Sequence, residues 1–122
     1  METFVEVLFI INVAFLVIGH EMDAIQQHEW RFFFAKTGMS DQASYRLFTA
    51  LHIPLFVLII WNLQSVSFQI GFDLFLVLHA GVHWLLRNHP LISFNSWFSR
   101  LWIFGGAFLG LLPLVLLCAI SS

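Results

Sequence analysis

Long apolar runs alternate with short polar segments along the whole chain. Each run is about as long as a helix needs to cross a bilayer, which is about 20 residues. We therefore predict four spanning helices, over residues 4–20, 47–63, 68–86 and 97–120. Almost nothing remains for a separate water-soluble domain. The pattern predicts an all-α polytopic membrane protein, a single four-transmembrane-helix bundle.

The composition supports a membrane protein over a soluble one. Of the 122 residues, 60% are hydrophobic and 10% are charged, and a small soluble globule buries too little of its chain to hide so much apolar surface. The start METFVEV is acidic and no small-residue cleavage site follows the first apolar run, so we expect no removable signal peptide. Cys118 is the single cysteine, which excludes an internal disulfide and leaves the redox compartment undetermined.

The basic residues indicate the orientation. All five flank the same set of span ends: Arg31, Lys36, Arg46, Arg87 and Arg100. The opposite side, which holds both termini and the turn WNLQSVSFQI, has no Lys or Arg. By the positive-inside rule the basic side is cytoplasmic and both termini face outward. Because topology explains the few basic residues, nucleic-acid binding has no support.

The first helix is expected to extend into the cytoplasm beyond the bilayer. It should continue past His20 to about Lys36 and end near Gly38, since glycine suits a helix C-cap. Ser40 or Asp41 then offers an N-cap for the second spanning helix.

Four histidines fall at one depth of the predicted bundle. His20 closes the first span, His52 lies near the start of the second, and His79 and His83 lie near the end of the third. Because successive spans alternate in direction, all four belong to the cytoplasmic half of the bilayer. Ionisable residues are costly there and usually functional.

Their spacing favours a metal site. His79 and His83 form an H-x-x-x-H pair, which lets two imidazoles reach one metal from one helix face, and Asp23 shares a helical stripe with His20. Imidazole with carboxylate suits Zn²⁺, Fe²⁺ or Mn²⁺. The predicted ligands are His20, Asp23, His52, His79 and His83.

Two glutamates are additional candidates. Glu21 follows His20 directly, whereas Glu29 lies about half a turn away from His20 on an unbroken helix and ranks lower. A carboxylate not needed as a ligand could act as a general base on a metal-bound water or bridge two metals. The leading hypothesis is therefore a metal-binding membrane protein, such as a metal-dependent enzyme acting on a lipid-soluble substrate.

Two alternative functions stay open. Histidines on facing helices, such as His52 with His79 or His83, could ligate haem in a haem or quinone anchor of a respiratory complex. The chain could also be a non-catalytic accessory or assembly subunit, packed on a larger membrane complex or on a second copy. In that case the histidines only hydrogen-bond between helices.

Glycines and acidic residues in the outer half have simpler interpretations. Gly106-x-x-x-Gly110 in the fourth span allows close helix approach within the bundle. Glu6 and Asp73 lie away from the histidine level and are interpreted as carboxylates of the outer interface.

Three segments together support a family resemblance. HEMDAIQQHEWRFF, LHIPLF and HAGVHWLL resemble a family of small, uncharacterised bacterial membrane proteins with four predicted helices. The chain is also distantly similar to membrane proteins named for an H-x-x-E-E motif, with His20-x-x-Asp23 as the counterpart and Ala24 in place of the second glutamate. The resemblance implies a multi-pass protein of the bacterial inner membrane, with periplasmic termini and a polar site.

Overall fold

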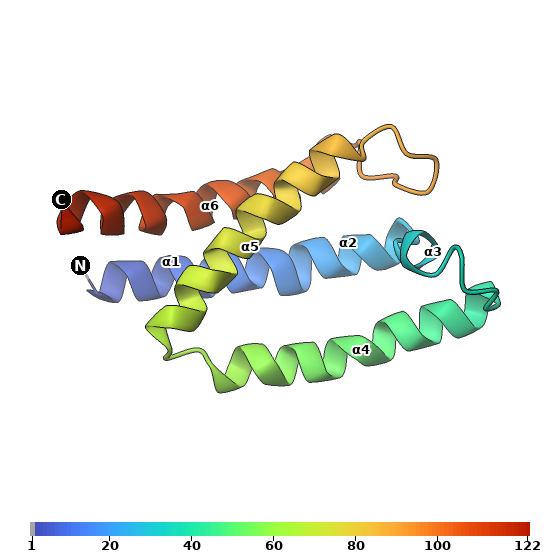
Figure 1. Ribbon diagram of the computed structural model, residues 1–122, viewed down its shortest axis with the longest axis horizontal. Coiled ribbons are helices and arrows are strands. Elements are labelled where there is room, and N and C mark those ends of the chain that lie inside the picture. Colours follow the sequence, from blue (N-terminus) through green and yellow to red (C-terminus); the bar gives the residue numbers. More distant parts are fainter. Residues whose placement is uncertain (1) are drawn as a thin grey trace.

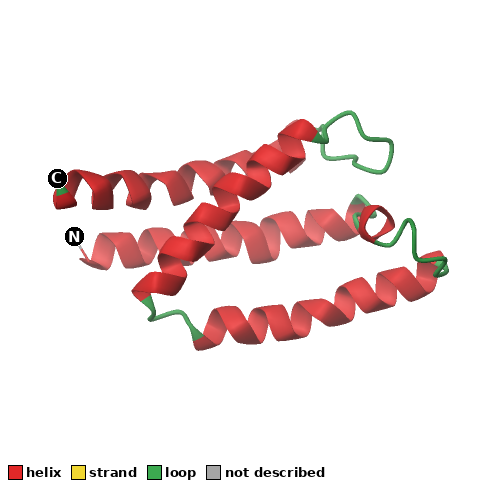
Figure 2. Cartoon of the chain, viewed as in Figure 1, coloured by secondary structure: helices red, strands yellow, loops and turns green. Residues whose placement is uncertain are grey.

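The computed structural model describes residues 2–122, and within this range the chain is helical with no strand (Figure 2). This confirms the all-α class. In chain order the elements are α1 (Glu2–Ala14), the π-helical segment η1 (Phe15–His20), α2 (Glu21–Gln26), α3 (Trp30–Phe33), α4 (Asp41–Trp61), α5 (Val66–Leu85) and α6 (Trp97–Ser121).

In the part of the chain that the structure describes, four helices are long and apolar enough to cross a membrane. The first is the continuous run Thr3–Gln26, formed by α1, η1 and α2, and the others are α4, α5 and α6. Large apolar side chains stay exposed along them, including Trp61 at 85% and Leu78 at 70%. A soluble protein rarely exposes apolar surface so continuously, so these helices indicate a multi-pass membrane protein.

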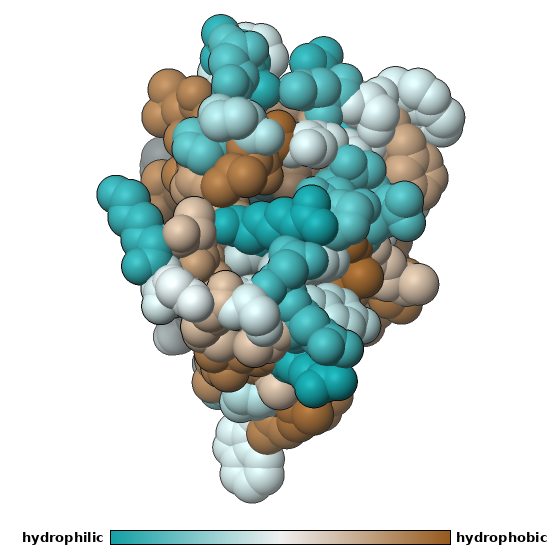
Figure 3. All heavy atoms as spheres, turned by 90° about the vertical axis from the view of Figure 1, so that its right-hand side faces the viewer, coloured by the Kyte–Doolittle hydropathy of each residue, from teal (hydrophilic) through white to brown (hydrophobic). Residues whose placement is uncertain are grey.

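Both termini lie at one end of the molecule, and the α2–α4 and α5–α6 connections lie at the other (Figure 1). Hydrophilic side chains gather on the end that holds the connections (Figure 3). Helix α5 crosses obliquely and packs most extensively on α6, whereas α4 packs mainly against the short α3. Helix α4 is thus the least attached of the four long helices.

Two groups of buried apolar side chains hold the bundle. Near the termini, Phe9 packs edge-on against Phe72 with ring centroids 5.5 Å apart, and Leu16, Ile59 and Leu76 complete this cluster. Toward the connections the second cluster comprises Ala24, Trp30, Phe48, Ala80, Ile92, Phe94 and Ile103. These two clusters join the first long helix to α4 and α5, which carry the four histidines predicted to lie at one depth.

The first helix does not continue to Lys36 as the sequence suggested. Helix α2 ends at Gln26, and His28 adopts a left-handed backbone conformation with φ 59°. A regular helix cannot pass through such a residue, so the chain turns before α3 begins at Trp30. This break reorients every side chain that follows it.

The connection to α4 follows the sequence signals more closely. Gly38 adopts the left-handed conformation with φ 73°. The hydroxyl of Ser40 accepts a hydrogen bond from the Ala43 backbone N–H at 3.1 Å, which makes Ser40 the N-cap of α4. Asp41 in the first turn of α4 accepts hydrogen bonds from Arg31 Nε at 2.8 Å and Trp30 Nε1 at 3.0 Å. These contacts attach α3 to the start of α4.

Candidate metal centre

His20 is the last residue of η1 and is 1% exposed. A π-helical segment changes the phase of a helix and is frequently found at functional sites. The preceding residue, Gly19, lies so close to the indole ring of Trp102 on α6 that there is no room for a Cβ atom. Close packing of η1 on α6 therefore sets the position from which His20 points toward α5.

His79 and His83 occupy one face of α5, one turn apart, as the H-x-x-x-H spacing predicted. Their Nε2 atoms lie 3.1 Å apart. The ring centroid of His20 is 4.5 Å from that of His79 and 5.2 Å from that of His83. Three imidazoles from two helices thus meet edge to face at one point.

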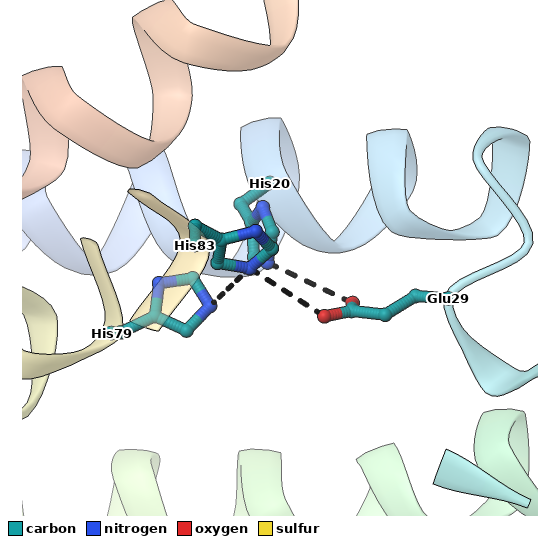
Figure 4. Close-up of side chains that lie close together, drawn as sticks. All are labelled: His20, Glu29, His79 and His83. Atoms are coloured by element: carbon teal, nitrogen blue, oxygen red, sulfur yellow. Dashed lines mark hydrogen bonds and ion pairs between the residues drawn. The ribbon is translucent and has the colours of Figure 1, made fainter. Parts of the chain in front are cut away.

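Glu29 completes the group, because the break after α2 turns its side chain back toward the bundle. Its Oε2 atom lies 3.8 Å from His20 Nε2, and its Oε1 atom lies 3.6 Å from His83 Nε2. Figure 4 shows the carboxylate facing the three imidazoles from the opposite side. The ligand atoms of His20, Glu29, His79 and His83 all lie within 4.8 Å of one another.

The dimensions of this group are close to those of a metal coordination shell. In a tetrahedral zinc site with bonds of about 2.0–2.1 Å, ligand atoms are separated by about 3.3 Å. The distances of 3.1, 3.6 and 3.8 Å bracket that value. The remaining pairs of ligand atoms lie within 4.8 Å, so the four side chains could hold a metal ion once they move closer together.

The cluster is shielded from solvent. His83 and Glu29 are 8% and 6% exposed, and the ring of Phe94 lies 5.3 Å from that of His20 and 4.8 Å from that of His83. Within residues 2–122, the Nδ1 atoms of His20 and His83 have no hydrogen-bond partner. An unpaired buried imidazole nitrogen is costly, and this cost stays with the Nδ1 atoms, because the atoms that approach Glu29 are the Nε2 atoms.

His52, which the sequence predicted as a ligand, lies outside the group and pairs with Glu21. Its Nδ1 atom donates to the Phe48 carbonyl at 2.7 Å, and its Nε2 atom contacts Glu21 Oε2 directly. Since a carbonyl can only accept, Nδ1 bears a proton. The Nε2 contact then needs one proton, on either the imidazole or the carboxyl group.

Asp23, the other predicted ligand outside the group, faces a different side of the helix. It accepts a weak hydrogen bond from Gln27 Nε2 at 3.4 Å and lines a hollow beside α6 together with Gly19 and Trp102. His20 instead lines a groove beside α4. The two residues of the predicted stripe therefore face different grooves.

The groove beside α4 has a volume of about 540 Å³. Its wall contains three members of the cluster (His20, Glu29 and His79) and both members of the Glu21–His52 pair. The remaining lining is apolar and comprises Phe33, Phe34, Phe48, Leu51, Leu55 and Phe75. The two polar groups therefore share one largely apolar groove.

A separate polar contact lies nearer the termini. Asn12 Nδ2 donates to Asp73 Oδ1 at 2.9 Å, and the two residues are 0% and 3% exposed. Asp73 is thus buried between helices. The sequence had suggested a position at the outer interface, which is wrong for this residue. Gly110 on α6 lies against this pair, since a Cβ atom there would be 3.1 Å from Asn12 Nδ2.

These features define a class: an all-α protein with four apolar helices of membrane-spanning length and a buried His/Glu cluster that could hold a metal ion. Residues 5–120 match the model of DUF6713, a family of unknown function, and the chain belongs to that family. No curated protein and no solved structure matches the chain.

Proposed function

We propose that this chain is a metal-dependent membrane protein that binds one divalent ion through His20, Glu29, His79 and His83. The observation behind the proposal is the convergence of these four ligand atoms within 4.8 Å. A shell of three imidazoles and one carboxylate suits Zn²⁺, Fe²⁺ or Mn²⁺. Such an ion would act as a Lewis acid or activate a water molecule.

We further propose that the ion acts on a lipid-soluble molecule. Three of its four ligands line the largely apolar groove beside α4, and the helices around that groove are of membrane-spanning length. The distribution of Lys and Arg supports a site in the cytoplasmic half of the membrane with both termini outside, and the resemblance to bacterial membrane proteins supports a bacterial inner membrane with periplasmic termini. Association with a larger membrane complex or a second copy stays a prediction.

Metal content tests this function directly. The detergent-purified protein would be analysed by elemental mass spectrometry, with an absorption spectrum recorded on the same sample. We expect about one zinc, iron or manganese ion per chain, lost in the His79→Ala/His83→Ala double variant. The control is His28→Asn, because His28 is an exposed histidine outside the cluster, and asparagine tolerates its left-handed backbone.

Two results would contradict the proposal. Protein without bound metal, whose properties do not change in the double variant, would leave the histidines as inter-helix contacts and favour an accessory subunit. Iron with a Soret band would favour a haem anchor instead.

A further inference from the structure

The groove beside α4 has two unlike regions. The polar region holds the Glu21–His52 pair together with His20, Glu29 and His79 of the histidine cluster. The apolar region is formed by phenylalanine and leucine side chains from three helices: Phe33, Phe34, Phe48, Leu51, Leu55 and Phe75. A groove of this composition matches a molecule with one polar head and an apolar body.

The apolar region opens toward the lipid-facing surface of α4. Leu51 and Leu55 line the groove, yet they are 52% and 37% exposed. Since α4 packs mainly against α3, a bilayer around the spanning helices would give hydrocarbon access to the groove beside Leu51 and Leu55. An amphiphile can therefore enter from the membrane without crossing water.

The polar region disfavours an anionic head group. Two carboxylates, Glu21 and Glu29, line the groove, and no Lys or Arg does. An anionic head group would therefore lie beside carboxylate oxygens, with no Lys or Arg in the wall of the groove to pair with it. Arg31, the basic side chain nearest in sequence to Glu29, instead pairs with Asp41.

Hydrogen-bonding capacity favours an oxygen-bearing neutral head. Glu21 lines the groove and contacts His52 through Oε2, and Oε1 is the second acceptor atom of its carboxylate. A head-group hydroxyl can donate to this atom and offer its own oxygen to a neighbouring metal ion. A carbonyl head can offer its oxygen to the metal but cannot donate to Glu21.

We propose that the groove beside α4 binds a neutral, lipid-soluble molecule, with its hydroxyl or carbonyl head between the histidine cluster and Glu21–His52 and its apolar body along Leu51 and Leu55. This inference rests on the proposed metal site, because the head group faces it, and it adds the substrate class and the binding groove. Glu21 is then a residue that selects the head group.

The test uses the metal-loaded full chain in lipid nanodiscs and photoactivatable diazirine probes with the same alkyl chain. One probe carries an alcohol head, one a ketone and one a carboxylate, and labelled peptides are identified by mass spectrometry. Leu55→Trp fills the groove, and Leu58→Trp is the matched control, because Leu58 lies on α4 but outside the groove. Leu51→Trp is a second groove-filling variant. Metal content is measured on every sample.

We expect the alcohol or ketone probe to label the groove segments of α4 and α5 in the native chain and in Leu58→Trp. Labelling should fall about tenfold in Leu55→Trp and Leu51→Trp, with metal content unchanged. The carboxylate probe should label weakly. In Glu21→Met, which removes the acceptor oxygens, a drop in alcohol labelling without a drop in ketone labelling would assign a hydroxyl head. Unchanged labelling by both probes would assign a carbonyl head.

Failure of the inference is distinguishable from failure of the metal site. Metal-loaded protein whose labelling is the same in Leu55→Trp and Leu58→Trp, or is strongest with the carboxylate probe, would overturn the groove assignment and leave the metal site standing. Protein that binds no metal would overturn the proposed function, and the head-group contact with it.

Discussion

Gly19 of η1 lies directly against the indole ring of Trp102 on α6. A Cβ atom at position 19 would be 2.9 Å from Cγ of Trp102 and closer still to two further ring carbons. Since His20 is the next residue and a member of the cluster, this contact between two helices determines where one imidazole of the candidate site lies.

The first prediction is that Gly19→Ala lowers both stability and metal content. Overpacking of this kind costs about 1–3 kcal/mol, and moving η1 away from α6 moves His20 as well. Thermal unfolding in detergent and elemental analysis would measure the two effects. Gly71→Ala on α5 is the control, because nothing lies within 4 Å of a Cβ atom there. The second variant Gly19→Ala/Trp102→Leu should recover part of the loss, and an unaffected Gly19→Ala protein would refute the packing argument.

The second prediction separates the ligand set of the structure from that of the sequence. Glu29→Gln should lose more metal affinity than the about 10–100-fold typical of removing an outer-shell partner, because it weakens a direct ligand. Asp23→Asn and His52→Gln should retain metal, because neither residue reaches the cluster. Metal titration of the three variants measures this. Loss of metal in Asp23→Asn with retention in Glu29→Gln would favour the sequence-based set.

The difference between these two ligand sets shows what the sequence could and could not predict. The length of the apolar runs predicts the long helices, and the H-x-x-x-H spacing places His79 and His83 on one face. The position of Glu29 depends on the break at His28, where neither glycine nor asparagine signals a left-handed residue. On an unbroken helix Glu29 would lie about half a turn away from His20. Because the chain turns at His28, the Glu29 carboxylate instead lies close to the His20 ring.

The direction in which side chains point around the first long helix also could not be predicted from the sequence. The stripe that joins His20 to Asp23 assumes a regular α-helix, and the π-helical segment ending at His20 alters that regular phase. The pairing of His52 with Glu21 could not be foreseen either, because it depends on where α4 stands beside the bundle. Tertiary packing, rather than local pattern, decides both.

The third prediction concerns the close approach of α6 to the Asn12–Asp73 pair. Gly110→Ala places a Cβ atom 3.2 Å from the Asp73 carbonyl oxygen and 3.1 Å from Asn12 Nδ2. Because the first of these is a backbone atom that cannot move aside cheaply, we expect a loss of about 1–3 kcal/mol. Gly106→Ala is the matched control from the same motif, since its nearest contact is an ordinary 3.7 Å. Denaturant unfolding in micelles compares the two, and equal stability would contradict the prediction.

The fourth prediction is that Asn12 and Asp73 are energetically coupled. Asn12→Leu leaves a buried carboxyl group without its 2.9 Å hydrogen bond, which costs about 1–3 kcal/mol. Replacing both residues with leucine removes the unpaired group as well, so the double variant should be more stable than the sum of the single effects predicts. A double-mutant cycle measured by unfolding provides the coupling energy, and strict additivity would show that the contact contributes nothing.

The fifth prediction tests the orientation, in a Cys118→Ser background that removes the single native thiol. Met39→Cys lies in the α3–α4 connection and Ser122→Cys at the C-terminus, at opposite ends of the molecule (Figure 1). All Lys and Arg flank the end that contains Met39, so the positive-inside rule places it in the cytoplasm. A membrane-impermeant maleimide should label the Ser122→Cys variant in intact spheroplasts and the Met39→Cys variant only after lysis. The reverse pattern would invert the orientation, and labelling of both variants in intact spheroplasts would contradict the placement of these positions on opposite sides of the membrane.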